Sequence, residues 1–165
     1  MHLFLRQYYS RGGSGAGKTS LLNALCGRAY YGQISGKVTI NGHAGHGIED
    51  FKDSVGFVPQ DDIMYSELTV EENLIFSGRF KLPAETTDDD IFALAGRVMA
   101  SLGLSRIGNS RVGDVTRRGI SGGEKKRVNI GIELMGNPKI LFLDEPTRYV
   151  PVRAIVSLFI HSCIN

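Results

Sequence analysis

The stretch GGSGAGKTS, from Gly12 to Ser20, decides the fold class of this chain. It contains the pattern G-x4-G-K-[ST] without a gap, which is the pattern of a phosphate-binding loop. Glycines let the backbone N–H groups of such a loop turn inward around phosphate oxygens. Lys18 can reach the β- and γ-phosphates of a nucleotide, and Thr19 can bind Mg²⁺. The stretch therefore predicts a nucleotide site in an α/β domain.

The residues after this loop favour a nucleotide site more strongly than the residues before it. Downstream, residues 20–28 form a plausible helix with leucines on one face, and the N-terminus of that helix would favour the negative charge of a phosphate. A flexible Gly-Ser loop is the alternative, but it would need no such helix. Upstream, residues 2–9 read HLFLRQYY, where Arg6 and Gln7 stand at positions that a buried central strand would fill with apolar side chains.

A second motif is the apolar run Ile140–Leu143, which is followed by Asp144 and Glu145. Continuous apolarity is typical of a parallel strand that is covered on both faces. In phosphate-loop ATPases an acid at the end of such a strand holds Mg²⁺, and a second acid can orient or deprotonate the attacking water. Acids are also common at ordinary strand ends, so this motif gains its weight from the phosphate loop.

A third motif, ISGGE at residues 120–124, precedes a helix whose predicted apolar face is Val128, Ile132 and Met135. A serine and two glycines at a helix start can form a second anion site. The alternative is an N-cap with a flexible hinge. A second phosphate site in one chain is reasonable if it serves a nucleotide that another subunit holds.

Two short strands are predicted between the first and second motifs. Residues 37–41 alternate between polar and apolar side chains like a half-buried strand, and residues 54–58 form another strand that Pro59 stops. His43 and His46 lie between them in a glycine-rich turn. We interpret this turn as a solvated loop rather than a metal site, because no further Cys or His ligands are near.

Two helices are predicted between these strands and the ISGGE motif. Thr69 and Glu72 form a capping box, so a helix begins there and runs toward Phe80. Thr87 begins a second helix with apolar residues at helical spacing, and Gly103 ends it. The whole pattern is α/β with a helical insert.

Composition and charge exclude several classes of protein. With 165 residues the chain is long enough for one domain. Its net charge of +2 offers no general attraction to nucleic acid, so we expect no nucleic-acid partner, and we expect the basic runs at 117–118 and 125–127 to face solvent. Cys26 and Cys163 are far apart, which indicates no metal site and favours a reducing compartment. No apolar run approaches the roughly 20 residues needed to cross a bilayer.

Taken in order, GGSGAGKTS, GFVPQDD, ISGGEKKRVNIG and ILFLDEPT resemble the nucleotide-binding domain of an ATP-binding cassette (ABC) transporter. The details ISGGEKKRV, LTVEENL and VPQDD resemble the G subfamily, the white/pigment-type half-transporters. The resemblance covers residues 12–147. It implies a P-loop NTPase fold, in which an ABC-type ATPase domain carries a helical subdomain at about residues 69–135.

The resemblance also implies a set of roles in binding and hydrolysing ATP with Mg²⁺. The implied nucleotide-binding residues are Gly12, Gly13, Ser14, Gly15, Ala16, Gly17, Lys18, Thr19, Ser20, Gln60, Ser121, Gly122, Gly123 and Glu124. Glu124 stands where many family members have Gln. Mg²⁺ would be held by Thr19, Gln60 and Asp144, and Glu145 would be the general base.

Partners follow from the same resemblance. In this family two such domains close head to tail over two ATP molecules, so residues 121–123 would touch the γ-phosphate held by a second cassette. Gln60 would couple the site to the transmembrane domain of the transporter. The cassette is therefore expected on the cytosolic face of a membrane, with no transmembrane segment of its own.

Both ends of the chain depart from the family pattern. Residues 1–11 do not match, and residues 148–165 begin RYVP where the family continues with Ser-Gly-Leu-Asp. We therefore expect an incomplete domain, weakly active or inactive alone, that arose by truncation, alternative splicing or a wrong gene assignment. His161 follows an apolar run as the family's γ-phosphate-sensing histidine does, but residues 148–154 are too few for a crossover between parallel strands. The rival hypotheses are a non-catalytic nucleotide-binding fragment and a soluble ABC ATPase that drives no transport.

Overall fold

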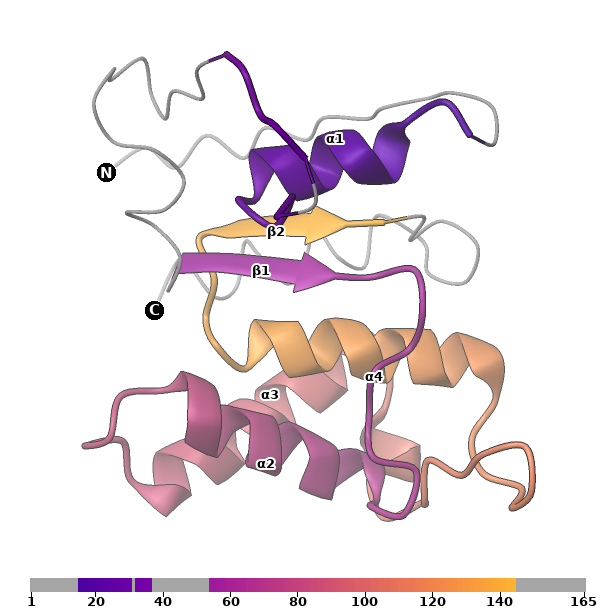
Figure 1. Ribbon diagram of the computed structural model, residues 1–165. Helices are drawn as coiled ribbons and strands as arrows, with labels where there is room; N and C mark the ends of the chain where they lie inside the picture. The colour runs from indigo at the N-terminus through magenta and orange to yellow at the C-terminus, as the bar shows by residue number, and fades with distance from the viewer. Residues whose placement is uncertain (1–14, 31, 37–53, 145–165) are drawn as a thin grey trace.

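The computed structural model describes residues 15–30, 32–36 and 54–144, and the predicted strand at 37–41 lies outside this part (Figure 1). The described elements are α1 (Lys18–Leu25), β1 (Val55–Val58), α2 (Val70–Lys81), α3 (Asp88–Leu102), the 3₁₀ helix η2 (Ser105–Ile107), α4 (Gly122–Leu134) and β2 (Ile140–Leu143).

Strands β1 and β2 pair in parallel, which confirms the parallel strand predicted at residues 140–143. The register places Val55 beside Ile140 and Val58 beside Leu143. Both strands therefore end at the same edge of the sheet. In Figure 1, α1 lies on the β2 side of this strand pair, and α4 lies on the β1 side.

Helix α1 differs from the prediction at both ends. It begins at Lys18 rather than at Ser20, because the left-handed backbone of Gly17, with a φ of 79°, turns the loop directly into the helix. It ends at Leu25 rather than at Arg28, since Gly27 has a φ of 73°.

Helices α2 and α3 begin and end where local signals predicted. Thr69 and Glu72 form the predicted capping box: the Glu72 N–H donates to Thr69 Oγ1 at 3.2 Å, and the Thr69 N–H donates to Glu72 Oε2 at 2.8 Å. Thr87 caps α3 by accepting from the Asp90 N–H, and Gly103 ends it with a φ of 66°. These two predictions are confirmed.

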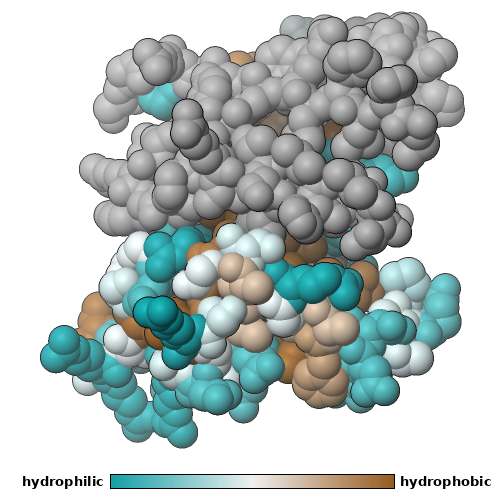
Figure 2. Space-filling view, turned by 180° about the vertical axis from the view of Figure 1, so that it is seen from behind, coloured by the Kyte–Doolittle hydropathy of each residue, from teal (hydrophilic) through white to brown (hydrophobic). Residues whose placement is uncertain are grey.

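The core lies mainly among α2, α3 and α4, and Val58 of β1 with Leu141 and Leu143 of β2 extends it to the strands (Figure 1). Its largest fully buried side chains are Val58, Val70, Leu74, Leu104, Val112, Val128, Ile130 and Met135. Val128 and Met135 belong to the predicted apolar face of α4, and Ile132 of that face is half-buried. Seen from behind, this helical part presents mostly hydrophilic side chains to solvent (Figure 2).

Candidate nucleotide site

The centre of the candidate site is a contact between Thr19 and Asp144, which lie 125 positions apart in the chain. The Thr19 hydroxyl donates a hydrogen bond of 2.7 Å to Asp144 Oδ2. Thr19 lies in the first turn of α1, and Asp144 directly follows β2. The structure thus brings together the phosphate loop and the acid at the strand end, as the two motifs predicted.

Asp144 is held firmly in this position. Its N–H donates to the carbonyl of Val58 at 3.0 Å, which continues the parallel ladder by one step, and the residue is only 3% exposed. In parallel α/β sheets ligands bind outside the carboxyl ends of the strands. The Asp144 carboxylate therefore lies at the edge where a nucleotide site is expected.

The donor set at this edge fits Mg²⁺. Thr19 offers a hydroxyl oxygen and Asp144 a carboxylate oxygen, and they lie within hydrogen-bond distance of each other. Mg²⁺ prefers hard oxygen ligands, and it usually takes one or two from protein and the rest from phosphates and water. The two side chains could supply that protein share.

The described end of the phosphate loop has the backbone that its glycines predicted. Gly15 and Gly17 both have a φ of 79°, in the left-handed region that favours glycine. Gly17 is the N-cap of α1, and no side chain caps this helix end. Gly15, Ala16, Gly17 and Ser20 are exposed and Lys18 is half-buried, while Gly12, Gly13 and Ser14 lie outside the described residues.

Gln60 lies near the same sheet edge. It follows β1 by two positions, and β1 ends beside β2 because Val58 pairs with Leu143. Gln60 is exposed, and its carbonyl accepts a hydrogen bond of 2.8 Å from Lys126 Nζ.

Ser121 and Glu124 form a capping box at the start of α4, so Ser121 is the N-cap of this helix. Glu124 Oε2 accepts from the Ser121 hydroxyl and from the Ser121 N–H, both at 2.7 Å. The hydrogen bond from the Ser121 hydroxyl is the main cause that lowers the pKa of Glu124 below its usual value, and the hydrogen bond from the Ser121 N–H is the second. Gly122 and Gly123 form the first turn of α4, which lies across the strand pair from α1 (Figure 1). Within one chain, this motif therefore does not share a site with the Thr19–Asp144 pair.

The basic run at 125–127 corrects a prediction. It was expected to face solvent, yet Lys126 is only 3% exposed, and its ammonium donates to the carbonyls of Pro59 and Gln60 at 2.6 and 2.8 Å. Lys125 donates to the Gly113 carbonyl at 2.6 Å. Helical spacing was the available signal, because Lys126 is four positions before the buried Ile130 and shares its face. The number of charges alone does not indicate that Lys126 is buried.

The other basic run does face solvent. Both its arginines are exposed, and Arg117 pairs with the exposed Glu67 at 3.0 Å. Glu145, His43, His46 and His161 lie outside the described residues.

Two features are absent from the described part of the chain. Among residues 15–30, 32–36 and 54–144, no helix has the length and apolar character to span a bilayer. The same part of the chain contains no group of three His, Cys, Asp or Glu side chains that could hold a metal ion. A magnesium site of the kind described above does not require such a group, because phosphates and water complete it.

Comparison with known proteins gives a consistent result. A family model described as ABC transporter matches residues 8–148. ABC transporter G family member 28 of Arabidopsis thaliana is 49% identical over 136 residues, which are 82% of this chain and 12% of that protein. Member 14 of the same family and species is 51% identical over 136 residues, which are 82% of this chain and 20% of that protein.

A longer alignment joins this chain to ABC transporter G family member 25 of Arabidopsis thaliana. The two are 44% identical over 147 residues, which are 89% of this chain and 22% of that protein. The chain thus spans between 12% and 22% of the length of these three relatives.

Proposed function

This chain belongs to the ABC transporter family as an ATP-binding cassette of the G type, and we propose that it binds ATP with Mg²⁺ and hydrolyses it to drive transport across a membrane. The observation that carries the proposal is the hydrogen bond of 2.7 Å between Thr19 and Asp144. It joins the phosphate loop to the acid at the end of β2, the two elements that a metal–nucleotide complex needs.

The magnesium site in this proposal uses side chains at the carboxyl edge of the strands. The Thr19 hydroxyl and the Asp144 carboxylate would hold the ion, and Gln60 would approach it from the end of β1. Bound there, Mg²⁺ would neutralise charge on the β- and γ-phosphates. Asp144 is already fixed by its backbone bond to Val58, so binding would cost little rearrangement of the protein.

The phosphate loop would hold the nucleotide. Backbone N–H groups of residues 12–17 would surround the phosphates, and the N-terminus of α1 would add its favourable partial charge. The Lys18 ammonium would contact the β- and γ-phosphates. Glu145, next to Asp144 in the sequence, would take a proton from the attacking water as general base.

A second cassette is the proposed partner for the start of α4. Ser121, Gly122 and Gly123 would contact the γ-phosphate held by that cassette and stabilise its developing charge. Two features support this: the start of α4 lies across the strand pair from α1, and a side chain at Gly122 would meet open space (Figure 1). An anion could therefore approach the backbone there.

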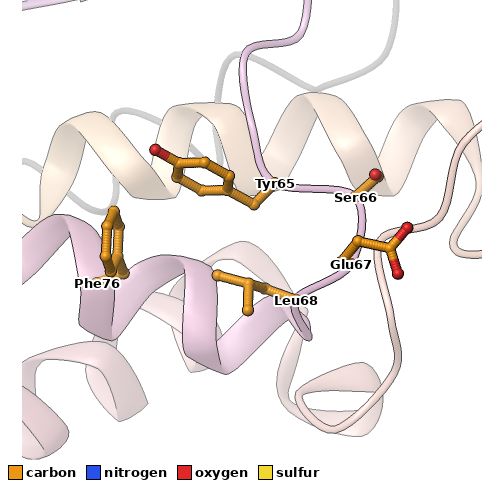
Figure 3. Close-up of a pocket in the computed structure, with 5 residues that line it drawn as sticks. All are labelled: Tyr65, Ser66, Glu67, Leu68 and Phe76. Atoms are coloured by element: carbon orange, nitrogen blue, oxygen red, sulfur yellow. The ribbon is translucent and has the colours of Figure 1, made fainter.

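The transmembrane domain of the transporter is the second proposed partner, on the cytosolic face of a membrane. The apolar patch formed by Tyr65, Phe76 and Phe80, whose rings contact one another in that order, is the candidate contact. These three side chains are 58%, 41% and 74% exposed. Tyr65 and Phe76 line a surface pocket, with their rings edge to face at 5.2 Å (Figure 3). Tyr65 follows Gln60 by five positions, so a helix docked on the patch would contact a segment that is close in sequence to Gln60.

The two rival hypotheses are less well supported. A soluble ABC ATPase would have no use for an exposed aromatic patch so near Gln60. A non-catalytic fragment would not need Thr19 and Asp144 to be held in register. Mg²⁺-dependent ATP hydrolysis separates this proposal from the non-catalytic fragment, which would bind ATP without turnover.

The test uses the full-length transporter that contains this cassette, purified and reconstituted. Thr19→Val removes the hydroxyl and keeps the shape, and we expect hydrolysis to fall about 10²–10³-fold, because one charge-stabilising element is lost. Thr19→Ser keeps the hydroxyl and should retain most of the rate. Equal rates for Thr19→Val and the unmodified protein would refute the proposed site.

A further inference from the structure

Three successive carbonyls after β1 are held by one face of α4. Lys126 Nζ donates to the carbonyls of Pro59 and Gln60 at 2.6 and 2.8 Å, and Asn129 Nδ2 donates to that of Asp61 at 3.3 Å. Lys126 is 3% exposed and Asn129 is 2% exposed. The segment that carries Gln60 is therefore fastened to α4 by two buried side chains.

The ammonium of Lys126 has a well-matched environment. Besides the two carbonyls, Asp62 Oδ1 lies 3.6 Å from Nζ. Two of the three N–H donors of the ammonium are thus hydrogen-bonded to carbonyls, and the Asp62 carboxylate adds an opposite charge nearby. Burial of an ammonium without such partners would be strongly unfavourable. The contact consequently fixes the path of the chain at Gln60, and it does not merely fill space.

The same segment is tied to the nucleotide site at its other end. The Val58 carbonyl accepts from the N–H of Asp144, and Asp144 accepts from Thr19. Val58 is therefore bonded to Asp144 at the proposed magnesium site, and Gln60, two positions later, is bonded to Lys126. The position of Gln60 depends on both attachments.

We propose that Lys126 is a positioning residue for ATP hydrolysis, which acts by holding the backbone of Gln60 and so aiming its side chain at the magnesium edge. The inference rests on the proposed function. In this proposal α4 has two roles. Its first turn contacts the nucleotide of the partner cassette, and Lys126, one turn later, positions Gln60 in the nucleotide site of its own chain. Displacement of α4 by the partner would then move Gln60 directly.

The test compares Lys126→Met with Lys125→Met in the reconstituted full-length transporter. Methionine keeps most of the side-chain length and removes the ammonium. For Lys126→Met we expect a KM for MgATP close to that of the unmodified protein and a kcat lower by about 10- to 100-fold, since misplacement of a catalytic surround affects turnover strongly. Lys125→Met removes an ammonium bound to Gly113, away from Gln60, and should leave kcat nearly unchanged.

A double-mutant cycle shows whether Lys126 acts through Gln60. In a Gln60→Ala background, Lys126→Met should lower kcat little further, because residues that act as one unit are not additive. Lys126→Arg keeps a cationic donor and should restore part of the rate. Additive losses, or a loss accompanied by weaker ATP binding and a lower Tm, would overturn the positioning role in favour of a purely structural one.

Amide hydrogen exchange provides an independent readout. In Lys126→Met the amides of residues 60–62 should exchange faster while those in the centre of α4 stay protected. Absence of both binding and turnover in the unmodified transporter would overturn the proposed function itself. Normal turnover in the unmodified protein and in Lys126→Met alike would overturn only the role of Lys126.

Discussion

Two long-range contacts of single residues shape the candidate site: the hydrogen bond from Thr19 to Asp144, and the hydrogen bond from Lys126 to the Gln60 carbonyl. Thr19 and Asp144 each belong to a motif with a known place, a helix start and a strand end, so their meeting at one sheet edge could be predicted. Lys126 belongs to a run of charges, and such runs usually face water. Only the packing of α4 against the segment after β1 shows that this ammonium is buried.

Asp114 provides a prediction of pH dependence for a single residue. Its carboxylate accepts from the Thr116 hydroxyl at 2.6 Å, from the Arg117 N–H at 2.9 Å and from the Thr116 N–H at 2.7 Å. These bonds lower the pKa of Asp114 from 3.8 to about 2. Because the pKa is lower in the folded protein than in the unfolded one, the carboxylate's contribution to stability is fully present above pH 3.8 and is lost as the pH falls toward 2.

The measurement for Asp114 is a carboxyl NMR titration of the folded protein, in which its resonance should have a midpoint near 2. Asp114→Asn should remove this residue's share of the stability loss in that acid range. A midpoint at the ordinary value of 3.8 would contradict the hydrogen-bonded turn.

At the scale of elements, Gly131 lets α4 pack closely against α2 and α3. A Cβ atom at Gly131 would lie 2.9 Å from Leu74 of α2, 3.2 Å from Leu102 and 3.3 Å from Val98 of α3. We expect Gly131→Val to destabilise the protein by about 1–3 kcal/mol, as overpacking of a core does. Denaturant unfolding measures the loss as a lower midpoint.

Gly96 of α3 supplies the matched control for that prediction. It is also a glycine inside a helix, but a Cβ there would meet open space. Gly96→Val should be neutral or slightly stabilising, because valine has a better helix propensity than glycine. Equal losses for Gly131→Val and Gly96→Val would show that helix contact does not set the cost.

Helix ends were predictable to the extent that their signals are local. The capping box of Thr69 and Glu72 and the stop at Gly103 involve residues close in sequence, so the pattern alone located them. Helix α1 begins two positions before its predicted start, because the left-handed backbone of Gly17 turns the loop directly into the helix. Nothing in the sequence indicates that Gly131 is a contact point between three helices.

At the scale of the whole molecule, sequence predicted the α/β class and the parallel strand, and the structure adds the order of the layers. Helix α4 lies between the strand pair and the other two helices of the core (Figure 1). This place explains how one helix can carry Ser121 at its start, Lys126 against Gln60 and Gly131 in the core. Such an arrangement depends on long-range packing, which periodicity does not encode.

The apolar patch of Tyr65, Phe76 and Phe80 carries the last prediction, which concerns the assembled transporter. If the transmembrane domain covers this patch, Phe80→Cys should be shielded from a water-soluble maleimide in the full-length protein, whose other cysteines are replaced. Phe92→Cys on α3 is the control, because Phe80 and Phe92 are both exposed here, at 74% and 47%. An isolated patch of this kind would be an association hazard, so a partner that buries it is expected. Mass spectrometry of the labelled protein gives the two rates; equally fast labelling at both positions would show that the membrane part docks elsewhere.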